Sequence, residues 1–389
     1  MAAADAQLLW LSAAVRNDQF LLYAFDGTPD AGAVDELRRR AAVCDELTTR
    51  VDDDSRWRYP RWVRSDVADE QFVVHDRPGW PDCLAELAGV GRLDATRMPW
   101  RVHVYGRNVV VVQMSHALAD GTRGAALAGA LLGRRTPIPP VAAPRRGFLP
   151  WRAVQAARAH RGAPPSNPPR PALSVNARPA ATPVLRTLLP DRDRLWPTVT
   201  IGVLVAVADA LGGYCRERGE DVSRLGAEVP MAGPANGIAA ANNNFRNVSV
   251  GLYPELAVDE RARRIAADLD EQRRRGRHPS VLASAAAFDA VPAWLLRWGV
   301  GNFDPAARSP GVSGNTVVSS VNRGPADLSF GGRQVLFTAG FPALSPMQSL
   351  THGVHGIGDT VAVSVHADPV NVDVDDYLAR LADALGCQP

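Results

Sequence analysis

Apolar residues in the first 133 positions follow two different periods. Residues 19–25 form a short apolar run typical of a buried strand, and apolar residues then recur three and four positions apart between 34 and 44, as in a helix. Two segments rich in β-branched residues, 100–105 and 109–114, flank a short connection containing Gly106, which predicts a hairpin. Strands therefore alternate with helices, and the pattern predicts an α/β lobe.

The sequence SHALADG, residues 115–121, directly follows the second strand of this hairpin. An Ala/Leu-rich segment, 122–132, comes next and ends at Gly133, as helices commonly do. The polar residues of SHALADG are therefore expected in a loop that joins a strand to a helix.

Prolines dominate residues 137–183, which show hardly any apolar periodicity and which we interpret as a crossover between two lobes. A second α/β half follows. Its expected strands are 184–189, 227–231, 248–252, 316–321, 334–339 and 360–367, and its expected helices are 200–218, 259–275 and a last one between Asp373 and Gly386. We therefore predict a first lobe at 1–133, a crossover at 134–183 and a second lobe at 184–389.

Composition excludes several classes of function. The 389 residues are 46% hydrophobic, enough for packed cores, and 43 basic against 41 acidic residues give a net charge of +2, unlike a nucleic-acid-binding protein. The chain contains no lysine, so a Schiff-base lysine and the P-loop lysine are both excluded. The four cysteines form no CxxC pair, and no metal site or dense disulfide framework is expected.

The same composition predicts a cytoplasmic location. The N-terminal segment lacks the basic region of a secretory signal, and Asp5 interrupts its start. The longest apolar run, 199–208, is half of the roughly 20 residues that a membrane span needs. Peripheral contact with a membrane stays open.

His116 is the candidate for chemistry. A histidine that a buried strand delivers to a loop can act as a general base, taking a proton from a hydroxyl, thiol or amine. The alternative is a loop histidine held by hydrogen bonds, with Asp120 only capping the next helix. His352 and His355 lie three residues apart in an expected strand, where side chains alternate between faces, so they are not expected to bind one metal ion together.

The segment RLDATRMPWRVHVYGRNVVVVQMSHALADG closely resembles wax ester synthase/diacylglycerol acyltransferases, in which a PLW-like segment precedes a strand that ends in HHxxxDG. Trp100, His116, Asp120 and Gly121 fall on matching positions. Later segments resemble the same family in the same order, RLGAEVPMA, ANNNFRNVSVGLYP and GNTVVSSVNRGP, the last one being similar to NLVVSNVPGP. These later matches place the following residues on family positions, with Asn243 where the family has Gly and Ser320 where it has Asn: Pro230, Asn243, Asn244, Asn315, Ser319, Ser320, Gly324 and Pro325.

The resemblance implies the fold of coenzyme A-dependent acyltransferases, with two chloramphenicol-acetyltransferase-like lobes, each a mixed sheet with flanking helices, and a tunnel between them. It implies that His116 is the general base and that Asp120, beside Gly121, is structural and pairs with an arginine. The expected co-substrate is an acyl thioester, on coenzyme A or on an acyl carrier protein. The expected acceptor is a small alcohol or amine, and no bound cofactor is implied.

Two departures from the family leave the substrate open. Ser115 replaces the first histidine of the motif, and residues 200–203 lack the family's Asn-Asp pair. The candidates for contact with the oxyanion or the substrate are Ser115, Ser319, Ser320 and Asn322, with the helix-start amides after Gly121 as an alternative. Two other interpretations remain: a stand-alone condensation-type enzyme of specialised metabolism that forms an ester or amide, and a non-catalytic homologue that only binds ligand.

Overall fold

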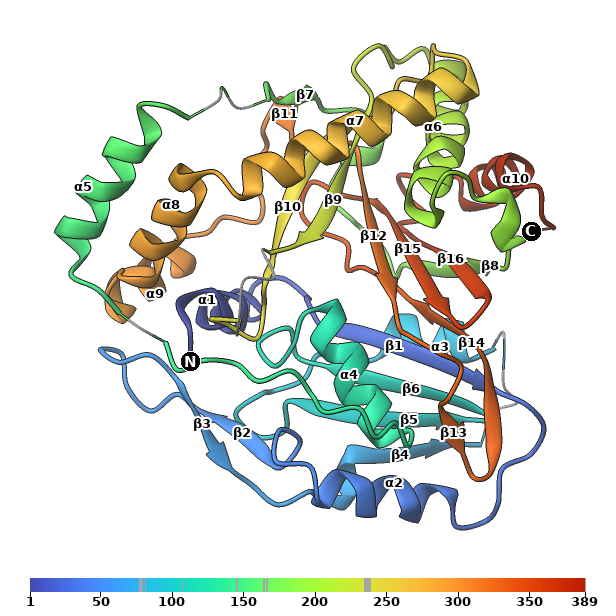
Figure 1. Cartoon of the computed structure of the whole chain (residues 1–389). Coiled ribbons are helices and arrows are strands. Elements are labelled where there is room, and N and C mark those ends of the chain that lie inside the picture. The colour runs from blue at the N-terminus through green and yellow to red at the C-terminus, as the bar shows by residue number, and fades with distance from the viewer. Residues whose placement is uncertain are drawn as a thin grey trace.

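The computed structural model describes residues 1–76, 80, 82–106, 108–144, 146–163, 165, 167–233 and 239–388. Within these residues, two six-stranded sheets form the centre of the molecule, one above the other in the view of Figure 1. Helices flank both sheets, so the expected mixed α/β architecture with two lobes is confirmed.

The first sheet has the strand order β13-β14-β1-β6-β5-β4. Its strands are β1 (Gln19–Phe25), β4 (Phe72–His75), β5 (Trp100–Tyr105), β6 (Val109–Met114), β13 (Ser329–Phe330) and β14 (Arg333–Gly340). The expected hairpin is β5 and β6, joined after Gly106, whose φ of 51° favours glycine.

A segment from late in the chain completes this first sheet. β14 pairs antiparallel with β1, with Leu22 opposite Ala339, so β1 is an inner strand between β14 and β6. In Figure 1 the orange β14 accordingly lies beside the blue β1. The lobe boundaries drawn from the sequence stay a prediction, but the first sheet contains strands from both halves of the chain.

The second sheet has the strand order β10-β9-β12-β15-β16-β8. Its strands are β8 (Val184–Leu188), β9 (Gly226–Ala232), β10 (Phe245–Gly251), β12 (Thr316–Asn322), β15 (Leu350–Ile357) and β16 (Thr360–Ala367). β12 runs parallel to both of its neighbours, β9 and β15, and the other pairs are antiparallel. The sheet is therefore mixed, as expected.

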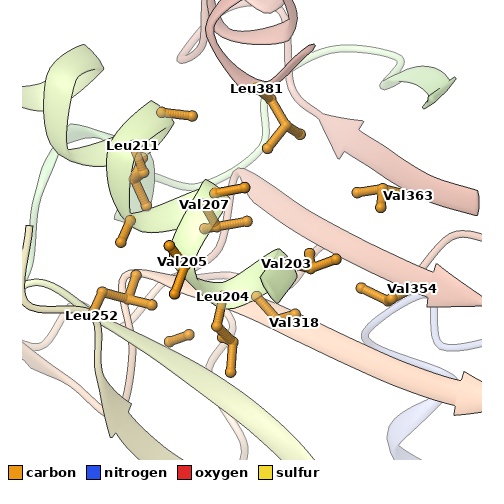
Figure 2. Packing of buried hydrophobic residues seen from close by; sticks show 14 of the residues in the cluster. Val203, Leu204, Val205, Val207, Leu211, Leu252, Val318, Val354, Val363 and Leu381 are labelled. Carbon is orange, nitrogen blue, oxygen red and sulfur yellow. The ribbon is translucent and has the colours of Figure 1, made fainter. Parts of the chain in front are cut away.

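Helix α6 (Val199–Glu217) is the central helix of the second lobe. Its apolar side chains pack against the strands and against α10 (Val374–Leu385), and Figure 2 shows Val207 and Leu211 among them. α6 is long and apolar enough to cross a membrane, but 61% of its apolar window is buried inside the fold, as in the core helix of a globular protein. α10 begins after Asp373, whose carboxylate caps it, and ends at Gly386 in the left-handed conformation.

The proline-rich crossover contains a helix that the sequence pattern did not predict, α5 (Leu149–His160). None of its residues is buried, so it lacks the apolar stripe by which helices are recognised. The remaining helices are α1 (Ala3–Leu11), α2 (Ala33–Ala42), α3 (Asp82–Gly89), α4 (Gly121–Leu131), α7 (Val258–Gly276), α8 (Pro279–Asp289) and α9 (Ala293–Gly301). Two small ladders, β2 (Thr49–Asp52) with β3 (Arg61–Arg64) and β7 (Arg170–Pro171) with β11 (Gly311–Val312), complete the elements that concern us.

Candidate active site

His116 lies in the loop between β6 and α4, beside a cavity of about 620 Å³. Both sheets contribute to the wall of this cavity: Phe20 comes from β1 of the first sheet, and Ser319 and Val321 come from β12 of the second. A cavity of this size can hold a small substrate. His116 is therefore placed where a bound molecule would meet residues of both lobes.

The hydrogen bonds of Asn243 determine the tautomer of His116. Nδ1 of His116 lies 2.8 Å from Oδ1 of Asn243. Nδ2 of Asn243 donates to the backbone oxygen of His116 at 2.6 Å and to Oδ1 of Asp5 at 2.9 Å. Because both of these atoms are acceptors, the amide nitrogen must face them and the amide oxygen must face the imidazole. The proton of His116 is therefore on Nδ1, and Nε2 carries a lone pair.

Asp5 holds Asn243 in this orientation. The Asp5 side chain is 2% exposed, and its carboxylate also accepts hydrogen bonds from the backbone amides of Asn242 and Asn243, both at 3.0 Å. Burial raises the pKa of Asp5, and these hydrogen bonds oppose that change. Asp5 acts on His116 only through Asn243, and it thereby connects α1 to the loop before β10.

The surroundings of His116 keep its imidazole neutral. Burial lowers the pKa of His116 below its usual value of 6.5, while the hydrogen bond with Asn243 and the charge of Asp120 oppose the change. The ring of Phe245 lies 5.6 Å away, centroid to centroid, and contributes to this apolar environment. A neutral imidazole with a free Nε2 can accept a proton, as a general base must.

Asp120 connects the start of α4 to the loop before β10. Its Oδ1 accepts a hydrogen bond from the backbone amide of Arg123 at 2.8 Å and so caps α4, while its Oδ2 accepts one from the amide of Asn244 at 2.9 Å. The expectation that an arginine pairs with Asp120 is wrong for the described residues, because backbone amides occupy both oxygens. Gly121 follows, and a Cβ there would lie 3.0 Å from Cγ2 of Val321, so glycine lets the start of α4 approach β12.

The structure separates the four candidate contact residues. Ser319 and Ser320 line the cavity, although Oγ of Ser320 lies 2.8 Å from Oγ1 of Thr200 at the start of α6. Asn322 instead accepts a hydrogen bond from the amide of Gly324 at 2.9 Å, in the turn after β12. Ser115 is 4% exposed and is not part of the cavity wall. Of these two candidates in the cavity wall, Ser319 is the serine whose hydroxyl has no hydrogen-bond partner among the described residues.

The start of α4 also faces the cavity. Gly121 and Thr122 line it, and their backbone amides have no acceptor among the described residues, as is typical of the first turn of a helix. These amides and the hydroxyl of Ser319 are the groups that could stabilise a negative charge near His116.

A second cavity of about 480 Å³ shares part of the wall of the first, including Phe20 and Phe341. Three arginines line it, Arg16, Arg92 and Arg178. This cavity is therefore more basic than the cavity at His116.

The histidines of β15 have separate surroundings. His352 is buried between Thr316 and Tyr377, with 2.7 Å from its Nε2 to the tyrosine oxygen, whereas His355 lines the cavity of His116. Among the described residues, no group of three or more His, Cys, Asp or Glu side chains is arranged to hold a metal ion.

Sequence reasoning missed Asp5 and Asn243 as parts of the site. Asp5 was visible as a carboxylate that interrupts an apolar segment, and Asn243 as a polar residue on a position where the resembled family has glycine. Neither observation shows which histidine they serve, because the contact joins residues 127 positions apart.

Known proteins resemble the chain both in sequence and in fold. Residues 243–387 match the family described as WS/DGAT C-terminal domain. The wax ester synthase/diacylglycerol acyltransferase from Marinobacter aquaeolei VT8 has a similar structure, with a TM-score of 0.65 and 18% sequence identity over 98% of this chain and 97% of that chain. No curated protein sequence matches the chain.

Condensation domains have the same fold. The starter condensation domain of rhizomide synthetase, in complex with C8-CoA and Leu-SNAC, matches with a TM-score of 0.61 and 14% identity over 99% of this chain and 92% of that chain. The first condensation domain of the calcium-dependent antibiotic synthetase, in complex with a substrate analogue, matches with a TM-score of 0.60 and 15% identity over 99% and 94%. The resemblance noted in the sequence is thus confirmed: residues 243–387 match the WS/DGAT C-terminal domain family, and the chain has a fold similar to that of a wax ester synthase/diacylglycerol acyltransferase and of condensation domains.

Proposed function

We propose that this protein is an acyltransferase that moves an acyl group from a thioester donor to a hydroxyl acceptor. The observation that carries the proposal is the state of His116, which is neutral and protonated on Nδ1, lies beside a cavity between the two sheets, and has no hydrogen-bond partner at Nε2 among the described residues. The similar fold of a wax ester synthase/diacylglycerol acyltransferase supports the reaction class.

The reaction is a direct transfer. Nε2 of His116 takes the proton of the acceptor hydroxyl while the hydroxyl oxygen attacks the thioester carbonyl. The carbonyl oxygen becomes a tetrahedral oxyanion, and collapse of this intermediate breaks the C–S bond. The imidazolium then returns the proton to the departing thiolate, so the reaction forms an ester and a free thiol without a covalent acyl-enzyme.

We assign two groups of donors to the oxyanion. The hydroxyl of Ser319 and the amides of Gly121 and Thr122 line the cavity that contains His116. Removal of one oxyanion donor typically lowers kcat by about 10²–10³. Ser319→Ala is therefore expected to lower kcat, and Ser320→Ala, whose hydroxyl already contacts Thr200, is the matched control.

The basic second cavity supports a donor with phosphate groups. Arg16, Arg92 and Arg178 are suited to bind the phosphates of an acyl-CoA, or the single phosphate of a carrier protein's phosphopantetheine arm. The condensation domain of rhizomide synthetase, whose structure contains C8-CoA, has a similar fold. In a comparison of acyl-CoA with the corresponding N-acetylcysteamine thioester, Arg178→Gln should raise KM for acyl-CoA alone.

A condensation-type enzyme that forms an amide is the second candidate, because two condensation domains share the fold. The same base would then deprotonate an amine. Assays with matched alcohol and amine acceptors distinguish the two reactions, and the candidate with the higher kcat/KM is the better description.

The decisive variant is His116→Gln. Loss of a general base lowers turnover by about 10²–10⁴, while the stability of the fold and the binding of a thioester should change little. A variant that keeps near-normal turnover would falsify the assignment. A wild-type protein that binds acyl thioesters without turnover would favour the non-catalytic interpretation.

A further inference from the structure

Arg323 is a buried cation without an acidic partner. It follows β12, lines the cavity of His116 and is 4% exposed. Its Nη1 donates to the backbone oxygen of Ala339 at 3.0 Å and to the hydroxyl of Thr338, and its guanidinium lies 5.3 Å from the ring centroid of Tyr23. Among the described residues, no carboxylate forms an ion pair with it. A buried charge normally has such a partner.

The carboxylates of the same cavity are engaged elsewhere. Asp120 accepts a hydrogen bond from the backbone amide of Arg123, which it caps. Asp18 accepts hydrogen bonds from the amide of Leu93 at 2.7 Å and from the side chain of Gln113 at 2.8 Å. Glu228 of β9 accepts hydrogen bonds from two polar side chains, Asn247 of β10 and Ser313. The protein therefore supplies no counter-charge to Arg323 from the acidic residues that line this cavity.

Two polar groups converge above Gly340. A Cβ built at Gly340 would lie 2.7 Å from Nη2 of Arg323 and 2.8 Å from Cε1 of His355, so the absence of a side chain there leaves room for both. Among the described residues, neither Nε of Arg323 nor Nδ1 of His355 has a hydrogen-bond partner. These two nitrogens are thus left for a molecule that enters the cavity.

We propose that this part of the cavity, formed by Arg323 and His355 around Gly340, binds a carboxylate carried by one of the two substrates. The inference rests on the proposed acyl transfer for its setting and adds the class of substrate. A guanidinium binds a carboxylate through short, charge-assisted hydrogen bonds. One buried cation matches one compact anion, whereas the several phosphates of coenzyme A match the arginines of the second cavity.

Arg323 acts on substrate choice and not on the base. Burial, together with the charge of Arg323, lowers the pKa of His355, whereas the pKa of His116 depends on burial, Asn243 and Asp120. The geometry likewise places the guanidinium beside His355, because both side chains approach the same point above Gly340. We accordingly describe it as a specificity residue.

Binding of glutarate, measured by calorimetry against its uncharged isostere glutaramide, tests the site without any turnover. Wild-type protein and His116→Gln should both bind glutarate more tightly, and Arg323→Met should lose roughly tenfold or more in affinity for glutarate alone. Equal affinity of the wild-type protein for both probes, no binding of glutarate, or unchanged affinity in Arg323→Met would each overturn the proposal. If Arg323→Met does not fold, Gly340→Ala replaces it in the same binding measurement. This variant should also lose affinity for glutarate, because its methyl group fills the space between the two side chains while Arg323 keeps its charge.

Kinetics then show which substrate carries the carboxylate. One comparison uses glutaryl-CoA and pentanoyl-CoA with the same alcohol, and the other uses 4-hydroxybutanoate and 1-butanol with the same acyl-CoA. The charged member of one pair should have a kcat/KM higher by roughly tenfold, and Arg323→Met should abolish this preference. No preference in either pair overturns the substrate assignment. Failure of the acyl-transfer proposal would appear differently, as the absence of turnover with all four substrates while glutarate still binds.

Discussion

Oδ1 of Asn243 accepts a hydrogen bond from Nδ1 of His116, although the two residues are 127 positions apart in the chain. The bond crosses from the loop after β6 in the first sheet to the loop before β10 in the second. The orientation of the candidate base therefore depends on the lobes being assembled, since neither loop alone contains both atoms.

The first prediction concerns Asn243. Replacement by Ala removes the acceptor that keeps the His116 proton on Nδ1, so kcat should fall by about tenfold to a hundredfold, within the range for disturbed general-base catalysis. Because this hydrogen bond raises the pKa of His116, the acid limb of the pH–rate profile should also move to lower pH. Asn302→Ala, at the residue that follows α9, is the control, and an unchanged profile in Asn243→Ala would contradict the role given to this bond.

The second prediction concerns the pH dependence of the wild-type protein. A general base must be deprotonated, so kcat/KM falls as pH drops through the pKa of the free base. Burial lowers the pKa of His116 below 6.5, and activity with a neutral alcohol should therefore persist below pH 6.5 before it declines. A midpoint of the acid limb above 6.5 would show that another group limits the reaction.

The third prediction separates structure from chemistry at Asp120. Asp120→Asn keeps one acceptor but turns an NH₂ group toward one of the two backbone amides, so the free energy of unfolding should fall by about 1–3 kcal/mol. Urea denaturation and soluble yield measure this loss. Asp94→Asn, at an exposed turn, is a suitable control. A fully stable but inactive Asp120→Asn would mean that the carboxylate acts in the reaction.

The fourth prediction concerns acid stability. Burial lowers the pKa of His103 and of His352 to about 4. As pH falls from about 6.5 to about 4, the unfolded chain binds a proton at each of these histidines and the folded chain does not. Each should therefore lower the free energy of unfolding by roughly 1.4 kcal/mol per pH unit in this window. Urea denaturation between pH 7.5 and 5 should show a smaller slope in His352→Gln and an unchanged slope in His160→Gln.

The fifth prediction concerns peripheral contact with a membrane, which we propose for the surface of α8 and α9. Trp294 and Trp298 of α9 are 47% and 65% exposed, and Leu282 of α8 is 51% exposed. Exposed aromatic and aliphatic side chains on helices are suited to the membrane interface. Binding to vesicles of phosphatidylglycerol and phosphatidylcholine should decrease in Trp294→Ala/Trp298→Ala but not in Trp196→Ala, which removes an equally exposed tryptophan before α6. Equal binding of both variants would contradict the proposal.

Local signals were sufficient for much of the fold. The hairpin of β5 and β6 follows from β-branched residues on both sides of Gly106, and α10 follows from the cap at Asp373 and the stop at Gly386. α5 was missed because none of its residues is fully buried and its half-buried face includes Arg152 and Gln155, so the sequence shows no apolar period. The same limit applies to α8 and α9, which have few buried residues.

The site could be predicted only where one motif held the residues together. His116, Asp120 and Gly121 lie within six consecutive residues at the end of one loop and the start of α4, and all three line the cavity. Asp5, Asn243 and Arg323 come from three other segments of the chain. Only folding brings Asp5 and Asn243 to the loop of His116, and Arg323 to the wall of the cavity. For the part of the chain that the structure describes, the expected arginine beside Asp120 was wrong, because backbone amides, which every sequence contains, can satisfy a carboxylate equally well.

The position of β14 affects how the protein is made. A ribosome synthesises the other long strands of the first sheet early, but the neighbour that β1 needs on one side, β14, emerges only after most of the chain. Until then β1 is an edge strand with unpaired backbone groups, which can pair with other chains and cause aggregation. Expression of the first lobe alone should therefore yield aggregates, and coexpression with the remainder of the chain should recover soluble protein because it restores the missing strand.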